Sequence, residues 1–272
     1  MSHVVSFLNN KGGVAKTMTA FNTGMYWGTK LNERVLFIDL DSQANLTSHI
    51  AGNDPRYVSE DGGFAWERTL EDAILGSPEL TPLPILPTEY PNIDFVPAGL
   101  SLSNFDTDVF MAPNKECILK AHIDSVRDKY DFIVMDCPPA LGGIVVNAMV
   151  ASDGIVLVTT GDKDSIEGVG MIASLFNGLT FATETEPATA PNLKLTGIAI
   201  TREKRDKITQ YWIKQISDAY PQYILNPHIK ERTILHQASS FRKDIFSYAP
   251  DSSSAAEYKE LAKDILRMLV ND

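Results

Sequence analysis

Cysteine is scarce in this sequence, which contains only Cys117 and Cys137 among its 272 residues. The two lie far apart and in no paired spacing, so the sequence indicates neither a disulfide framework nor a zinc or iron–sulfur site. Runs of 18 or more apolar residues are also missing, and the N-terminal residues lack the basic start and apolar stretch of a signal peptide. We therefore expect a protein of the reducing cytoplasm with no stable membrane association.

An excess of positive charge is missing as well. The formal net charge is −11 and the sequence pI is about 4.9, which argues against a broadly basic surface for nucleic acid but leaves room for a local patch. The composition, 44% hydrophobic and 22% charged, provides enough apolar material for a sizeable core. We expect one domain over residues 1–272, with surface insertions at about 52–68, rich in Gly, Asp and Ser, and at 77–92, rich in proline.

Short, nearly continuous apolar runs recur along the chain, and each is followed by a stretch of helical character. The first run, residues 4–8, ends in a glycine-containing turn, and residues 17–27 then have the pattern of a helix that ends at Gly28. A last helix is expected after the N-cap residues 251–254. The alternation predicts an α/β fold: a doubly wound, mainly parallel sheet with helices on both faces. The other apolar runs lie at 35–38, 132–135, 155–158 and 195–200.

The segment after the first apolar run, residues 11–17 (KGGVAKT), has the features of a phosphate-binding loop. Glycines let consecutive backbone N–H groups turn inward, and the helix that begins near Lys16 directs its N-terminus at the bound anion. The match to the Walker A pattern G-x-x-x-x-G-K-[ST] is partial, because Asn10 and Ala15 occupy its two glycine positions. The flanking strand and helix nevertheless indicate a nucleotide site.

An additional lysine, Lys11, turns this loop into the deviant Walker A signature K-G-G-x-x-K-T, and the chain resembles the ParA/Soj branch of the ParA–MinD family of ATPases. Residues 36–45 (LFIDLDSQAN) are similar to the family's second motif, with Ser42 in place of the common proline. Residues 132–139 (FIVMDCPP) are similar to its Walker B strand and D-x-P-P turn. The resemblance covers nearly the whole chain, with insertions between about residues 52 and 115.

Charge and position suggest roles around this loop. Lys16 should lie against the β- and γ-phosphates of ATP, while Thr17 and Asp136 should hold Mg²⁺, with an ordinary strand-end cap as the alternative for Asp136. The resemblance implies that Lys11 reaches a partner protomer's phosphates, that Asp41 positions the attacking water and that Asp39 supports the magnesium shell. A helix cap is the alternative for Asp39. The catalytic candidates are thus Lys11, Lys16 and Asp41, and the nucleotide contacts are Lys11, Gly12, Gly13, Val14, Ala15, Lys16, Thr17 and Met18.

The resemblance implies two further sites. The adenine base is expected against Thr201 and Arg202, and against a later loop near Ile229, where Lys230 and Glu231 replace the family's Pro-Arg. Non-specific duplex DNA is expected on basic residues of a dimer surface, which contact phosphates without reading sequence. Acidic residues are interleaved with the candidate cations, so a solvated face of mixed charge is the alternative. The candidates are Lys204, Arg205, Lys207, Lys230, Arg232, Arg242 and Lys243.

The resemblance therefore implies a cytoplasmic, magnesium-dependent, ParA-like ATPase that partitions a plasmid, chromosome or mobile element, and that is nucleoid-associated if it binds DNA. ATP would drive homodimer formation, the dimer would hold DNA, and a ParB-like protein would stimulate hydrolysis to ADP and phosphate. The alternative is a MinD-like or cargo-positioning ATPase that acts through membrane or protein contacts without DNA. The mixed charges of the last helix speak against the membrane, and the two cysteines cannot supply the cluster of an iron-protein ATPase.

Overall fold

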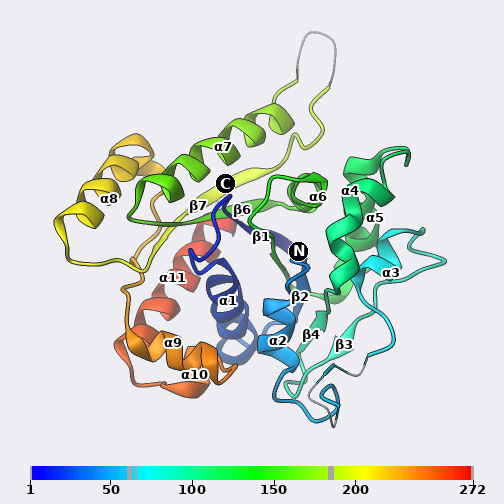
Figure 1. Cartoon of the computed structure of the whole chain (residues 1–272), viewed down its shortest axis with the longest axis horizontal. Coiled ribbons are helices and arrows are strands. Elements are labelled where there is room, and N and C mark those ends of the chain that lie inside the picture. The colour runs from blue at the N-terminus through cyan, green and yellow to red at the C-terminus, as the bar shows by residue number, and fades with distance from the viewer. Residues whose placement is uncertain (1, 60–62, 65, 183–186, 271–272) are drawn as a thin grey trace.

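The computed structural model describes residues 2–59, 63–64, 66–182 and 187–270. Within them the strands are β1 (His3–Leu8), β2 (Val35–Asp39), β3 (Leu86–Pro87), β4 (Ile93–Val96), β5 (Phe132–Asp136), β6 (Gly154–Thr160) and β7 (Lys194–Thr201). They form a seven-stranded sheet in the order β3-β4-β2-β5-β1-β6-β7 (Figure 1). Every neighbouring pair is parallel except β3–β4, which is antiparallel.

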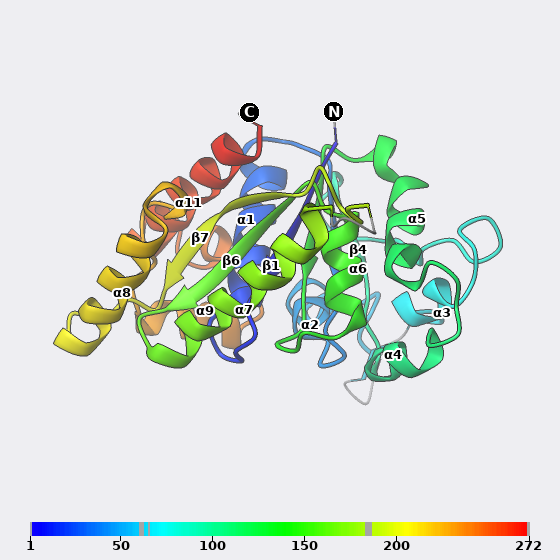
Figure 2. The same ribbon diagram turned by 90° about the horizontal axis from the view of Figure 1, so that it is seen from above.

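Helices cover both faces of this sheet (Figure 2). They are α1 (Lys16–Lys30), α2 (Asn45–Ala51), α3 (Leu70–Ile74), α4 (Phe105–Asp108), α5 (Ile118–Asp124), α6 (Gly143–Ala151), α7 (Lys163–Thr180), α8 (Lys207–Ala219), α9 (Thr233–Ser240), α10 (Ile245–Tyr248) and α11 (Ser253–Val270). Buried side chains of α1, α2 and α9–α11 pack on one face, and those of α3–α8 pack on the other. The expected doubly wound, mainly parallel α/β fold is confirmed. That residues 1–272 form one domain stays a prediction.

The five apolar runs of the sequence correspond to β1, β2, β5, β6 and β7, whereas β3 and β4 were not predicted. β4 pairs with β2 and, in turn, with β3, which lies inside the segment 77–92 that we expected to be a surface insertion. The segment 52–68 also contributes to the core, because Tyr57 is buried and packs edge-on against Phe95 with ring centroids 5.5 Å apart. Residues 60–62 and 65 of that segment lie outside the described residues. Both segments therefore contribute to the sheet or the core, and their assignment as surface insertions stays a prediction.

Gly28 does not end the first helix, as the sequence suggested, because α1 continues to Lys30. Gly28 is required because there is no space for a side chain between α1 and β4. A Cβ atom at Gly28 would lie 2.4 Å from Cδ1 of Ile93 on β4 and 2.6 Å from its Cγ1. The missing side chain therefore lets α1 approach the sheet closely, and this packing outweighs the low helix propensity of glycine.

Gly28→Ala is expected to lower the free energy of unfolding by about 1–3 kcal/mol, because the added methyl group overpacks a filled interface. Chemical denaturation monitored by circular dichroism would measure the change. Gly170→Ala on α7 is the matched control: a Cβ atom there meets nothing within 4 Å, so helix propensity alone should raise stability by about 1 kcal/mol. Equal stability of Gly28→Ala and the unmodified protein would contradict the close packing of α1 on β4.

The predicted C-terminal helix is confirmed as α11, and its N-cap lies among the expected residues. Ser252 Oγ accepts a hydrogen bond from Ala255 N at 3.1 Å, and the side chains of Tyr258, Leu261 and Ile265 on one face are buried. Residues 271 and 272, of which Asp272 makes the end of the sequence acidic, lie outside the described residues. Among the described helices, none is long and apolar enough to cross a membrane.

Candidate nucleotide-binding site

The phosphate-binding loop connects the carboxyl end of β1 to the N-terminus of α1. Asn9 anchors its start: the side-chain amide donates to Val158 O at 2.6 Å, and Oδ1 accepts from Lys11 N at 2.9 Å. Gly13 and Ala15 have φ values of +77° and +63°, in the left-handed region that favours glycine. Ala15 thus adopts the backbone conformation of the glycine that it replaces in the Walker A pattern, and it precedes the first residue of α1.

Lys16, the first residue of α1, is buried with only 7% of its surface exposed. Its Nζ donates to Lys11 O at 3.2 Å, across the loop. Burial lowers the pKa of Lys16, and the nearby carboxylates of Asp136 and Asp41 oppose that shift. The loop therefore holds a cation over its own concave side, where phosphate oxygens would lie.

Two buried carboxylates meet beside Lys16 because of the strand register. Parallel pairing places Asp39, at the end of β2, opposite Asp136, at the end of β5. Burial and then the proximity of Asp39 raise the pKa of Asp136 well above its usual value, and the nearby Thr17 hydroxyl and Lys16 ammonium oppose the shift. Both Asp136 oxygens are buried and have no hydrogen-bond partner among the described residues. An unpartnered buried carboxylate next to a hydroxyl suits Mg²⁺ held through water, which would remove the cost of leaving these oxygens unbonded.

Asp39 is engaged differently from Asp136. Its Oδ2 accepts from Thr47 N at 2.8 Å and from Thr47 Oγ1 at 2.7 Å, while Oδ1 accepts from Asp41 N at 3.1 Å. Burial raises the pKa of Asp39 to about 6, although these hydrogen bonds favour its charged form. Asp39 therefore binds the first turn of α2, which is the helix-cap alternative considered from the sequence. Its role in the magnesium shell stays a prediction.

Asp41 and Lys11 lie near the buried Lys16 and Asp136. Asp41 is partly exposed, its Oδ1 accepts from Gln43 N at 3.0 Å, and it lies within electrostatic range of Lys16. Lys11 Nζ pairs with Asp162 Oδ1 at 2.5 Å and lies 3.9 Å from Asp164 Oδ2. Asp162, which also caps α7, was missed from the sequence. The sequence signal for Asp162 is an acidic residue close behind a buried strand, since β6 ends at Thr160 and only Gly161 lies between them.

An apolar pocket of about 200 Å³ adjoins the loop. Thr201 and Arg202 line it, as expected for the base site, but the Thr201 hydroxyl is committed to Val14 O at 2.7 Å. Arg202 Nη1 donates to Gly13 O at 2.8 Å. Both side chains therefore stabilise the phosphate loop by hydrogen bonds to its backbone, and their contact with adenine stays a prediction. The pocket also includes residues from α9 and α11 that the sequence did not point to, namely Leu235, His236, Ser239 and Tyr258.

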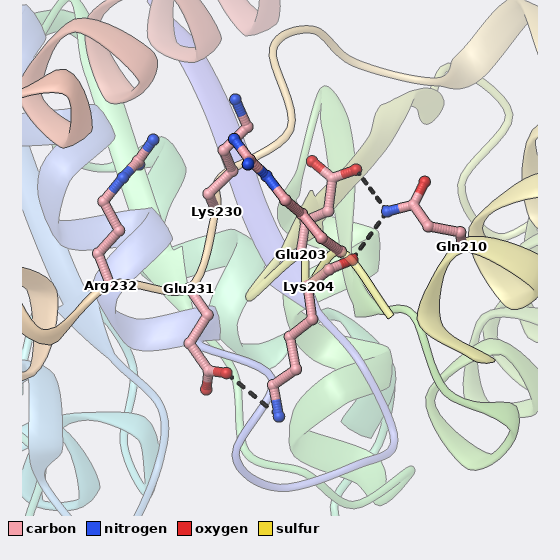
Figure 3. Close-up of a pocket in the computed structure, with 7 residues that line it drawn as sticks. Glu203, Lys204, Gln210, Lys230, Glu231 and Arg232 are labelled. Atoms are coloured by element: carbon pink, nitrogen blue, oxygen red, sulfur yellow. Dashed lines mark hydrogen bonds and ion pairs between the residues drawn. The ribbon is translucent and has the colours of Figure 1, made fainter. Parts of the chain in front are cut away.

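Four of the seven basic residues predicted to contact DNA lie around one cavity. A parallel bridge between Glu203 and Lys230 joins the segments 203–205 and 230–232, and together they line a cavity of about 680 Å³, here named the charged hollow (Figure 3). Arg242 lies elsewhere: its Nη1 donates to Gly52 O at 2.7 Å, which ties it to the end of α2. The residues of the charged hollow are Glu203, Lys204, Arg205, Gln210, Lys230, Glu231 and Arg232.

The parallel sheet and the loop between β1 and α1 define a P-loop nucleotide-binding protein with a deviant Walker A sequence. Residues 2–186 match a family model described as an AAA domain, and the chain belongs to this family, in its ParA/Soj branch. It is similar to the chromosome-partitioning ATPase Soj of Treponema pallidum, with 27% identity over 267 residues that cover 98% of each chain.

Two solved structures share the fold. One is cobyrinic acid a,c-diamide synthase from Mycobacterium smegmatis with bound ATP analogue and magnesium, at 24% identity, a TM-score of 0.78, and coverage of 100% of this chain and 96% of the other. The second is a plasmid partition protein from Borrelia burgdorferi, at 21% identity, a TM-score of 0.70, and coverage of 98% of this chain and 100% of the other. Because these names differ, the fold by itself does not assign the function.

Proposed function

We propose that this chain is a ParA-like partitioning ATPase that binds ATP with Mg²⁺ in the loop of residues 11–17. The observation that carries the proposal is the convergence of Lys16, Thr17 and Asp136, with both Asp136 oxygens buried and unpartnered within the described part of the chain. Lys16 holds the β- and γ-phosphates, and Thr17 and Asp136 hold Mg²⁺, which neutralises the charge that develops on the phosphates. Relatives named as chromosome-partitioning ATPases support the assignment.

Hydrolysis in this proposal depends on two further side chains at the same sheet edge. Asp41 orients the attacking water, because it is partly exposed and is not used to hold the phosphate loop. Lys11 leaves Asp162 and contacts the phosphates of a partner protomer, where added positive charge stabilises the transition state. Intrinsic turnover is slow until a ParB-like protein completes the site.

The ATP-bound homodimer presents the charged hollow and nearby cations to duplex DNA, without sequence preference. Arg205 and Lys207 support this surface, because both are exposed and neither has an acidic partner among the described residues. A net charge of −11 repels DNA, so attraction has to be local. Arg232 is paired with Glu257 at 2.5 Å, and it contributes less to such a surface than Arg205.

Arg205→Glu is expected to weaken duplex binding about tenfold and to flatten its salt dependence, because a phosphate contact is replaced by repulsion. Fluorescence polarisation at low salt with a non-hydrolysable ATP analogue and magnesium would measure this, and calorimetry should show unchanged ATP affinity. Lys120→Glu is the control with equal change in net charge. It lies on α5, which is at the opposite edge of the molecule from α8 (Figure 1). Arg242→Glu is a less clean test, because it also breaks the bond to Gly52.

Positioning of a cargo through protein contacts without DNA is the second candidate. The observation in its favour is that several cations of the charged hollow are already paired with acids, such as Lys204 with Glu231 at 3.1 Å. If duplex DNA does not bind under the low-salt conditions above, although the analogue binds and the protein dimerises, this second candidate replaces the first.

A further inference from the structure

Glu231 lies in the wall between the charged hollow and the apolar pocket, and cations contact its carboxylate from both sides. Its Oε1 accepts from Arg202 Nη2 at 2.9 Å and from Arg202 Nε at 3.2 Å. On the side of the hollow, its Oε2 pairs with Lys204 Nζ at 3.1 Å, as Figure 3 shows. Burial opposes ionisation, but these two cations outweigh it and hold the pKa of Glu231 below its usual value, so the group is charged at neutral pH.

The position of this carboxylate is fixed from several directions. Arg202, which holds Oε1, is itself bound to Gly13 O at 2.8 Å and has φ of +50°, a left-handed conformation that costs free energy for a residue with a side chain. The Glu231 backbone is held as well, since its N–H donates to Glu203 O at 3.1 Å. Glu231 therefore cannot swing away from Lys204 without giving up the bonds with Arg202.

The cations of the charged hollow are consequently not equivalent toward phosphate. Arg205 is exposed and has no acidic partner in the described part of the chain. Lys204 is paired with Glu231, so an approaching phosphate has to share the ammonium with a fixed carboxylate and also meets its negative charge. An acid placed in this way reduces the number of cations that can bind DNA.

We propose that Glu231 is a residue that lowers the affinity of the DNA surface: held by Arg202, it masks Lys204 from the phosphates of duplex DNA. This inference rests on the proposed function, because it assumes that the charged hollow faces DNA. The mask lowers the affinity of the protein for any duplex. Binding then depends on the few cations of the charged hollow that have no acidic partner in the described part of the chain. Removal of the charge at position 231 unmasks Lys204.

A double-mutant cycle on duplex binding tests the mask. Glu231→Gln keeps an oxygen for Arg202 but removes the charge, and it is expected to tighten binding about fivefold, in the range of an exposed ion pair, and to steepen the salt slope by about one. Lys204→Gln should weaken the unmodified protein less than twofold, yet cancel the gain when it is added to Glu231→Gln. Fluorescence polarisation of a labelled duplex with non-hydrolysable ATP analogue and magnesium gives all four affinities.

Glu260→Gln on α11 is the control, because it changes the net charge equally at a position paired with Lys263. If Lys204→Gln weakens binding equally in both backgrounds, Lys204 is not masked and the inference is overturned. The same holds if Glu260→Gln tightens binding as much as Glu231→Gln. Failure of all four proteins to bind the duplex, with intact analogue binding by calorimetry, instead overturns the proposed DNA function and the inference with it.

Discussion

The Lys16→Ala variant is expected to lose measurable ATP binding, with an affinity reduced by at least about 100-fold. Lys16 is the buried cation that the loop holds over its concave side, and charge-assisted hydrogen bonds to two phosphates contribute about 1.5–3 kcal/mol each. Nothing else in the loop replaces it, since Lys11 is paired with Asp162. Isothermal titration calorimetry with ATP and magnesium would measure the loss.

The fold should tolerate this change. Burial raises the pKa of Asp136, so its carboxyl can take up a proton when the neighbouring ammonium is removed, instead of remaining an isolated buried charge. Lys30→Ala, at the other end of α1, is the control and should bind ATP normally. Unaltered ATP affinity in Lys16→Ala, with a native circular dichroism spectrum, would exclude this loop as the phosphate site.

Asp41→Ala is expected to retain ATP, to lower turnover by about 100-fold and to accumulate a long-lived dimer. Asp41 is assigned to the water and not to the phosphates, and loss of a group that orients or activates a nucleophile costs about 10²–10⁴ in rate. The Asp41 side chain accepts a hydrogen bond from Gln43 N, which is a local contact, so the binding loop should keep its structure. Multi-angle light scattering with ATP and magnesium would show the dimer.

Asp124→Ala, an exposed acid on α5 paired with Lys120, is the matched control and should hydrolyse ATP normally. The role of Asp41 would be wrong if the variant stays monomeric with ATP while the unmodified protein dimerises. It would also be wrong if turnover by Asp41→Ala equals that of the control.

The predictions from sequence succeeded where structure is local. Five strands appeared as apolar runs because parallel strands are buried on both faces, and the start of α11 followed from the Ser252 cap. β4 was missed because it is only Ile93–Val96 and directly follows a proline-rich segment. Gly28 was misinterpreted as a helix end. The residue that leaves no space for a side chain at this position, Ile93 on β4, lies 65 positions away in sequence.

The sequence by itself determined the phosphate loop, because strand, glycines, lysines and helix start lie within residues 4–17 and act through their own backbone. Tertiary structure alone decided what surrounds it. The β2–β5 register sets Asp39 against Asp136, and the bridge between Glu203 and Lys230 creates the charged hollow. The sequence shows which charges exist, but their effect depends on distance and burial. Glu231 therefore became a partner of both Arg202 and Lys204 only when the chain folded.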